Sequence, residues 1–298
     1  MVEVTATPSD AVVTFEGRDG NRLAASAAGP TDGRPVVLLH GGGQTRHSWA
    51  TTLSSLSARG WRVYSVDLRG HGDSDWAKDG DYSLDAFAAD VRAVALALDE
   101  PPALVGASLG GLSSLLATGS QPGGGLASAL VLVDVAPRIE EAGRQRVGRF
   151  MLEHVSDGFA SLEEVADAIA AYNPHRPRPK DLSGLRKNLR YRDGRWFWHW
   201  DPQFMVGLRG GPDETRSSLA PPGVLEAAAR AVDCPVLIVR GRQSDLLSEE
   251  GARELLEMVR EGEMVDVAGA GHMVAGDRND AFNDSVVEFL ARRFARAE

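Results

Sequence analysis

One serine in this chain stands in a setting that could make it a nucleophile. The residues at 106–110 are Gly-Ala-Ser-Leu-Gly, and they lie between a short apolar run and a helix-forming run. A serine on a sharp turn from a strand into a helix exposes its hydroxyl above the sheet, close to a helix N-terminus that favours developing negative charge. The glycines at both ends of the segment let strand and helix approach closely. Ser108 is therefore the candidate nucleophile.

A serine hydroxyl is a weak nucleophile at neutral pH, so it needs a histidine to take its proton and a carboxylate to orient that histidine. His272 follows a glycine-rich turn after a strand predicted at residues 264–267. Asp245 follows an apolar, β-branched strand predicted at residues 236–239. The chain order serine, acid, histidine fits this type of site, which makes Asp245 and His272 the predicted partners of Ser108.

A second aspartate stays open as the acid. Asp134 ends the strand predicted at residues 129–133, so its carboxylate also belongs to the carboxyl end of a strand. We favour Asp245 because the chain order serine, aspartate, histidine and its place in the loop after the seventh predicted strand both fit this type of site. Asp134 remains the alternative, and replacing each aspartate by alanine would separate the two assignments.

The segment His-Gly-Gly-Gly at residues 40–43 predicts a loop that binds an oxyanion. It follows an apolar run at residues 36–39, and its glycines let backbone N–H groups point into the site. We expect Gly42 to be the donor in this loop, with Gly43 as the alternative. The backbone N–H of Leu109, next to the serine, is the second expected donor.

These motifs resemble those of the α/β-hydrolases, most of all the capped serine esterases, the cofactor-free haloperoxidases and the epoxide-hydrolase-like members. The resemblance covers nearly the whole chain, and its motifs lie at residues 40–43, 67–74, 106–111, 240–245 and 269–272. Epoxide hydrolases and haloalkane dehalogenases of this group carry an aspartate at the nucleophile position, whereas this chain has Ser108. A serine suits acyl transfer, so both of those activities are disfavoured.

The hydrophobic pattern predicts an α/β fold. Strands that alternate with helical stretches indicate a mostly parallel, eight-stranded sheet with helices on both faces, opened by an antiparallel hairpin. The clearest helices are predicted at residues 83–98, with Ser83 as N-cap, and at residues 281–294. The predicted strands cover residues 11–15, 22–27, 36–39, 62–66, 103–105, 129–133, 236–239 and 264–267.

The alternation stops between residues 137 and 220, which predicts a helical cap inserted after the sixth strand. The cap divides the core into residues 1–136 and 221–298, and in similar proteins a cap at this point covers the active site. Trp196, Trp198 and Trp200 lie in its most aromatic segment. Two interpretations stay open: these rings line an apolar substrate pocket, or they form the cap's own core.

Composition limits the partners and the compartment. The 298 residues carry a formal net charge of −10, which disfavours nucleic acid and anionic membranes as partners. No apolar run approaches the roughly 20 residues that span a bilayer, and residues 1–11 do not resemble a signal peptide. The single cysteine, Cys234, excludes an internal disulfide framework and fits a reducing compartment. We therefore expect a cytoplasmic protein.

The loop at residues 67–74 contains Asp67, His71 and Asp73, which could suggest a metal site. No companion cluster completes a coordination shell, so no metal is expected there. His40 and His71, each beside glycine, are expected to make structural hydrogen bonds and not to act as bases. We expect no cofactor.

The predicted function is hydrolysis of small to medium carboxylic esters through an acyl-enzyme intermediate, with a small-molecule substrate as the expected partner. The same triad could cleave a carbon–carbon bond, open a lactone or carry out perhydrolysis, and the fold also serves as a ligand receptor. The residues leave the natural substrate and the oligomeric state open.

Overall fold

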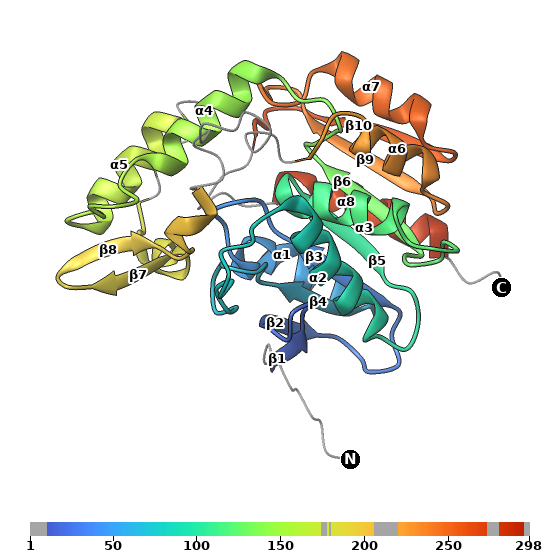
Figure 1. Cartoon of the computed structure of the whole chain (residues 1–298), viewed down its shortest axis with the longest axis horizontal. Helices are drawn as coiled ribbons and strands as arrows, with labels where there is room; N and C mark the ends of the chain where they lie inside the picture. Colours follow the sequence, from blue (N-terminus) through green and yellow to red (C-terminus); the bar gives the residue numbers. More distant parts are fainter. Residues whose placement is uncertain (1–10, 174–177, 179, 206–219, 273–279, 295–298) are drawn as a thin grey trace.

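An eight-stranded sheet forms the centre of the protein. The computed structural model describes residues 11–173, 178, 180–205, 220–272 and 280–294 (Figure 1). The strands of the sheet are β1 (Ala11–Glu16), β2 (Arg22–Ala28), β3 (Pro35–Leu39), β4 (Arg62–Val66), β5 (Ala103–Ala107), β6 (Ala129–Val133), β9 (Val236–Gly241) and β10 (Gly262–Val267). Their order is β1-β2-β4-β3-β5-β6-β9-β10, and β2 pairs antiparallel with both β1 and β4, whereas the other pairs are parallel. The predicted sheet is confirmed.

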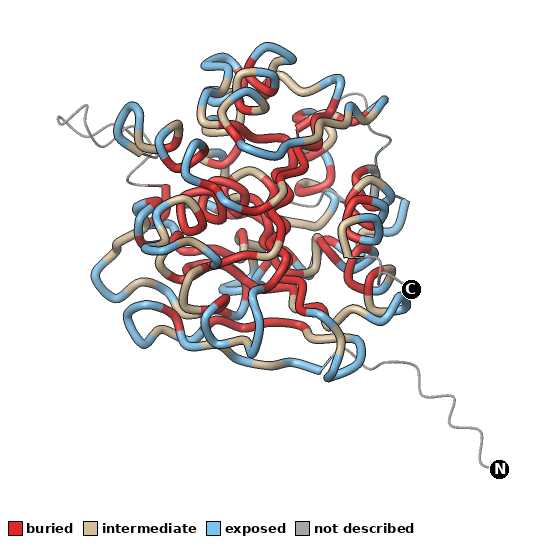
Figure 2. Tube along the Cα trace, turned by 90° about the vertical axis from the view of Figure 1, so that its right-hand side faces the viewer, coloured by how far each residue is buried: buried red, intermediate tan, exposed pale blue. Residues whose placement is uncertain are grey.

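Helices cover both faces of the sheet because successive residues of a strand point to opposite sides. Val37 and Leu39 of β3 belong to one apolar cluster, and Val36 and Leu38 to a second one. The first cluster includes α2 (Leu84–Leu96), α3 (Leu109–Gly119), α6 (Val224–Ala231) and α7 (Glu249–Met258), and the second includes η1 (Arg46–Trp49), α1 (Ala50–Ser57) and α8 (Asp280–Phe294). Figure 2 shows the buried trace running through the central strands between these layers.

The helices predicted most clearly are present. Ser83 caps α2 by accepting a hydrogen bond from the Ala86 N–H at 3.3 Å, and α8 covers nearly the residues predicted for the last helix. Within the described part of the chain, no helix has both the length and the apolar character needed to cross a membrane.

An insertion separates β6 from β9. It contains α4 (Glu141–Leu152), α5 (Leu162–Tyr172), η2 (Ser183–Asn188), β7 (Leu189–Arg192), β8 (Arg195–Trp198) and η3 (Pro202–Met205). In Figure 1 these elements extend to the left of the sheet, with α4 leading from the core toward α5 and the hairpin.

The prediction of a helical cap leaves out one element, because β7 and β8 pair as an antiparallel hairpin beside the helices of the insertion. Asp193 and Gly194 form its two-residue turn with φ angles of 52° and 79°. Positive φ at both central residues is the requirement of the type I′ turn, for which Asp-Gly is a preferred sequence. The sequence therefore contained the turn signal of this hairpin, although each of its two strands has only four residues.

Candidate active site

The turn between β5 and α3 places Ser108 at the carboxyl edge of the sheet. Ser108 has φ 46° and ψ −115°, a conformation that residues with a side chain rarely adopt. A Cβ atom on Gly106 would lie 2.5 Å from the Gly110 carbonyl carbon, and one on Gly110 would lie 2.4 Å from the Leu39 oxygen. Only glycines therefore allow this turn. Such backbone strain costs about 1–3 kcal/mol and is concentrated at functional sites.

His272 is held by Asp134. Its Nδ1 atom lies 2.8 Å from Asp134 Oδ2, and the two side chains are 3% and 1% exposed. The Asp134 carboxylate also accepts hydrogen bonds from the Gly241 N–H at 3.1 Å and from the Ser244 hydroxyl at 2.7 Å. Because an ionised carboxylate only accepts hydrogen bonds, Nδ1 carries the ring proton in the neutral imidazole. Nε2 then keeps a lone pair that can take a proton.

The prediction that Asp245 pairs with His272 is wrong, because the Asp245 carboxylate faces the insertion. It forms an ion pair with Arg146 of α4, with N···O distances of 2.6 Å and 2.9 Å. Asp134 directly follows β6, and its backbone N–H extends the ladder by donating to the Val239 oxygen at 2.7 Å. That bond fixes Asp134 at the carboxyl end of β6, whereas Asp245 lies in the loop beyond β9. The alternative acid is thus the one beside His272.

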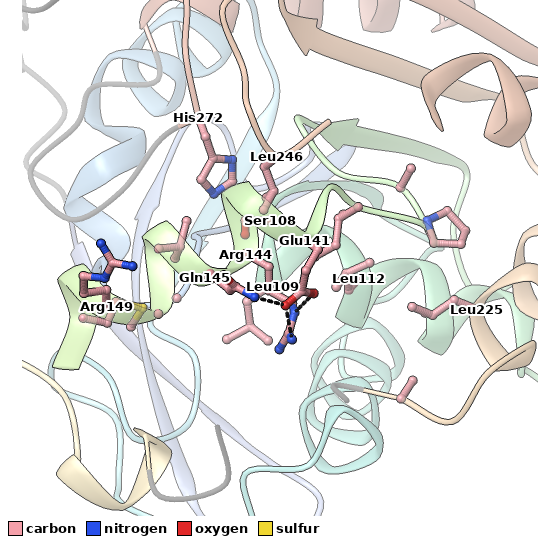
Figure 3. A pocket seen from close by; sticks show the side chains of 18 of the residues that line it. Ser108, Leu109, Leu112, Glu141, Arg144, Gln145, Arg149, Leu225, Leu246 and His272 are labelled. Atoms are coloured by element: carbon pink, nitrogen blue, oxygen red, sulfur yellow. Dashed lines mark hydrogen bonds and ion pairs between the residues drawn. The ribbon is translucent and has the colours of Figure 1, made fainter. Parts of the chain in front are cut away.

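Ser108 and His272 line one cavity of about 930 Å³. Figure 3 shows the His272 ring above the Ser108 side chain, although the two residues are far apart in the sequence. Residues of α4 form much of the wall of this cavity, and residues of α3 and α6 also line it. Most of the lining is apolar, while the polar side chains are concentrated on α4. The cavity therefore has room for an organic substrate next to both reactive side chains.

The glycine loop after β3 contains the two candidate oxyanion donors, Gly42 and Gly43, which differ in their surroundings. Gly42 lines the cavity, whereas the Gly43 N–H donates a hydrogen bond to His71 Nε2 at 3.1 Å. Leu109 also lines the cavity, and it is the first residue of α3, where backbone N–H groups have no acceptor within the helix. The geometry therefore favours Gly42 over Gly43 as the partner of Leu109 in binding an oxyanion.

His40 and His71 brace this loop as neutral rings. Burial lowers the pKa of His40 to about 4 and that of His71 to about 3. His40 Nε2 accepts from the Leu68 N–H at 3.0 Å and its Nδ1 lies 2.8 Å from the Gly41 oxygen, while His71 Nδ1 lies 2.9 Å from the Arg69 oxygen. Both nitrogens of each ring are thus used for structure. The expected structural role of the two histidines is confirmed.

Trp196, Trp198 and Trp200 do not line the cavity that contains Ser108, so their predicted pocket role is wrong in this structure. Trp198 and Trp200 are 5% and 3% exposed and stack with ring centroids 5.1 Å apart. Trp198 also packs against Phe150 of α4. Trp196 lies against Tyr191, on the neighbouring strand of the hairpin. The alternative interpretation, a place in the insertion's own core, is confirmed for Trp198, whereas Trp200 also pairs with His71 of the hydrolase core and Trp196 is only half-buried.

Two other groups that could do chemistry serve the structure. Asp67, in the loop considered for a metal, is buried in an ion pair with Arg46, which also pairs with Asp73 at 2.8 Å. No cluster able to hold a metal ion occurs among the described residues. Cys234 is buried, and burial raises the pKa of its thiol to about 12. A thiol with that pKa stays protonated at neutral pH and is a poor nucleophile.

Comparison with known proteins agrees with this fold. Residues 36–285 match the Alpha/beta hydrolase family. The chain is 31% identical over 270 residues to Esterase Rv0045c of Mycobacterium tuberculosis, covering 87% of this chain and 83% of the relative. It is 28% identical over 251 residues to a 3-hydroxybutyrate-oligomer hydrolase of Cupriavidus necator, covering 82% and 84% of the two chains.

A solved structure shows the same fold. The crystal structure of E-2-(acetamidomethylene)succinate hydrolase superposes with a TM-score of 0.79, covers 96% of this chain and all of that chain, and is 24% identical. The eight-stranded sheet, the serine on its strand-to-helix turn and the match over most of the sequence lead to one conclusion: the chain belongs to the alpha/beta hydrolase family.

Proposed function

We propose that this protein hydrolyses carboxylic esters by covalent catalysis at Ser108. The observation that carries the proposal is that Ser108 lines the same cavity as His272, whose Nδ1 is bound by Asp134. A nucleophile, a base and an acid that orients the base are the three groups that acyl transfer requires. The relatives named as an esterase and as an oligomer hydrolase support esters as the substrate class.

In the first step, the Ser108 oxygen attacks the acyl carbon while its proton moves to His272 Nε2. Asp134 stabilises the imidazolium that forms and holds the ring in place. The backbone N–H groups of Leu109 and Gly42 bind the negative oxygen of the tetrahedral intermediate. Loss of one such donor typically reduces the rate by about 10²–10³-fold, so the glycine loop matters to catalysis as well as the triad.

In the second step, the bond to the alcohol oxygen breaks and that oxygen takes the proton from His272. Water then attacks the acyl-enzyme while His272 again accepts a proton. The acid product leaves, and Ser108 recovers its hydroxyl hydrogen from His272. Apart from the ester and water, all groups that these two steps need belong to the protein itself.

The cavity supports small to medium acyl groups. Leu109, Leu112 and Leu225 line it and lie on the same side of Ser108 in Figure 3, which gives an apolar chain a surface to cover. On the α4 side, Glu141 forms hydrogen bonds with Arg144 and Gln145. We call the surface formed by these leucines the leucine side of the cavity, and we assign the acyl chain to the space between it and α4, whose apolar side chains also line the cavity.

A series of chromogenic esters, from acetyl to decanoyl, tests the proposal. We expect fast multiple turnover by the wild-type protein, no turnover by Ser108→Ala, and wild-type turnover by Ser54→Ala, a control at an exposed position of α1. A fluorophosphonate probe should label the wild-type protein at Ser108 only. A wild-type protein that neither turns over esters nor takes the label contradicts the proposal and favours carbon–carbon cleavage, lactone opening, perhydrolysis or ligand reception.

A further inference from the structure

Asp245, which lies where the acid was expected, makes its contacts with α4. Its carboxylate uses both oxygens on the Arg146 guanidinium, at 2.6 Å and 2.9 Å. The 2.9 Å contact is a hydrogen bond from Arg146 Nη2 to Asp245 Oδ1, and the 2.6 Å contact, between Nε and Oδ2, is an ion-pair contact. The side chains of Asp245 and Arg146 are 37% and 41% exposed, so the pair lies at the surface between core and insertion.

Helix α4 depends on such contacts because little of it is buried. Gly143, Phe150 and Met151 are its only buried residues. Its start is tied to the loop after β9: the Glu140 N–H donates to the Leu246 oxygen at 2.8 Å, and a Cβ on Gly143 would lie 2.2 Å from the Asp245 oxygen. The backbone and the side chain at Asp245 therefore both contact α4.

Arg146 also contacts α5, the next helix of the insertion. Its guanidinium donates to the Tyr172 carbonyl oxygen at 3.2 Å and lies 4.6 Å from the centre of the Tyr172 ring. Tyr172 is the last residue of α5. One arginine thus joins the loop after β9, α4 and α5.

The same loop is joined to the catalytic acid. The Ser244 hydroxyl donates to Asp134 Oδ2 and accepts hydrogen bonds from the Leu246 and Leu247 N–H groups, both at 3.2 Å. The loop is therefore a short, internally bonded unit. One side of it holds Asp134, and the other side holds the helix that forms a wall of the cavity.

We propose that the Asp245–Arg146 ion pair is a clasp that positions α4 over Ser108 and so determines which acyl groups the cavity accepts. Both are positioning residues, because neither lines the cavity. The proposal rests on the proposed ester hydrolysis. An ion pair this exposed acts weakly and is screened by salt, so we expect changes of about two- to fivefold.

A double-mutant cycle tests the clasp. Asp245→Asn keeps the size of the side chain, and Arg146→Met keeps most of its length, so both remove the ion pair with little loss of packing. We expect each variant to hydrolyse the acetyl ester like the wild type and to change KM for octanoyl and decanoyl esters two- to fivefold, with kcat nearly unchanged. The double variant should match the single ones. High salt should shift the wild-type values toward those of the variants.

Glu254→Gln is the matched control. It removes the ion pair of Glu254 with Arg138, at 2.9 Å, which also joins the insertion to the core but lies before α4. We expect it to leave the acyl-chain preference unchanged. An equal shift in this control, or fully additive effects of Asp245→Asn and Arg146→Met, would overturn the clasp.

Hydrogen exchange separates this inference from the proposed function. In Asp245→Asn, the backbone amides of α4 should exchange faster than in the wild type, while those of α2 should not change. This readout needs no ester. Unchanged exchange in α4 overturns the clasp even if ester hydrolysis is established, whereas faster exchange in a protein that hydrolyses no ester overturns only the function.

Discussion

The Gly43 N–H donates its hydrogen bond to His71 Nε2, so the glycine loop beside Ser108 is braced by a ring that must stay neutral. Burial holds the pKa of His71 at about 3 and that of His40 at about 4, against 6.5 for an exposed histidine. The unfolded chain therefore binds more protons than the folded one as the pH falls below 6.5. Stability from this source is complete above pH 6.5 and is lost progressively toward pH 4.

Urea unfolding at pH 4 to 7 measures this loss. Each buried histidine contributes a slope of up to about 1.4 kcal/mol per pH unit within that range. We expect His71→Asn to be less stable than the wild type at pH 7, because the Gly43 N–H loses its acceptor, but to show a shallower decline in acid. If the free energy of unfolding of this variant falls as steeply with decreasing pH as that of the wild type, a lowered pKa of His71 is contradicted.

A larger side chain on the leucine side of the cavity should change the preference for acyl-chain length. Leu225→Trp should fill the space that we assign to the end of the acyl chain. We expect kcat/KM for the decanoyl ester to fall by about tenfold or more, since part of the chain loses its apolar contact, and that for the acetyl ester to stay within about twofold. Leu96→Trp, at an exposed position of α2, is the control. Equal losses for both esters would place the acyl chain elsewhere.

The stacked tryptophans predict a loss of stability. Trp198→Ala removes a ring that is 5% exposed, and replacement of a buried Trp by Ala typically costs about 3–5 kcal/mol. Trp76→Ala, at a ring that is 41% exposed, should cost less than about 1 kcal/mol. Chemical unfolding of both variants tests this difference. Similar stabilities of the two variants would contradict a structural role for Trp198.

The sheet could be predicted from the sequence because parallel strands buried on both faces leave continuous apolar runs. The Ser108 turn could be predicted because glycines at 106 and 110 have a steric cause that the structure shows directly. The choice between Asp134 and Asp245 as the acid beside His272 could not be made from the sequence. Asp134 and Asp245 both follow strands that end at one edge of the sheet, and only the folded chain shows that the carboxylate of Asp245 faces α4.

The insertion was harder to predict for two physical reasons. The strands of its hairpin have four residues each, too few for a clear alternation, although Asp193-Gly194 indicated the turn. The aromatic rings were also ambiguous, because an apolar side chain fits a substrate cavity and a small core equally well. The packing of Trp198 on Phe150 decides for the core.

The most direct test of the catalytic triad compares Asp134→Asn with Asp245→Asn on the acetyl ester. Asparagine keeps the size of each side chain but cannot stabilise the imidazolium or hold the required tautomer of His272. We predict that kcat falls by about 10³–10⁴-fold in Asp134→Asn and stays within about twofold of the wild type in Asp245→Asn. A near-normal kcat in Asp134→Asn together with a large loss in Asp245→Asn would contradict the assignment of Asp134 as the catalytic acid.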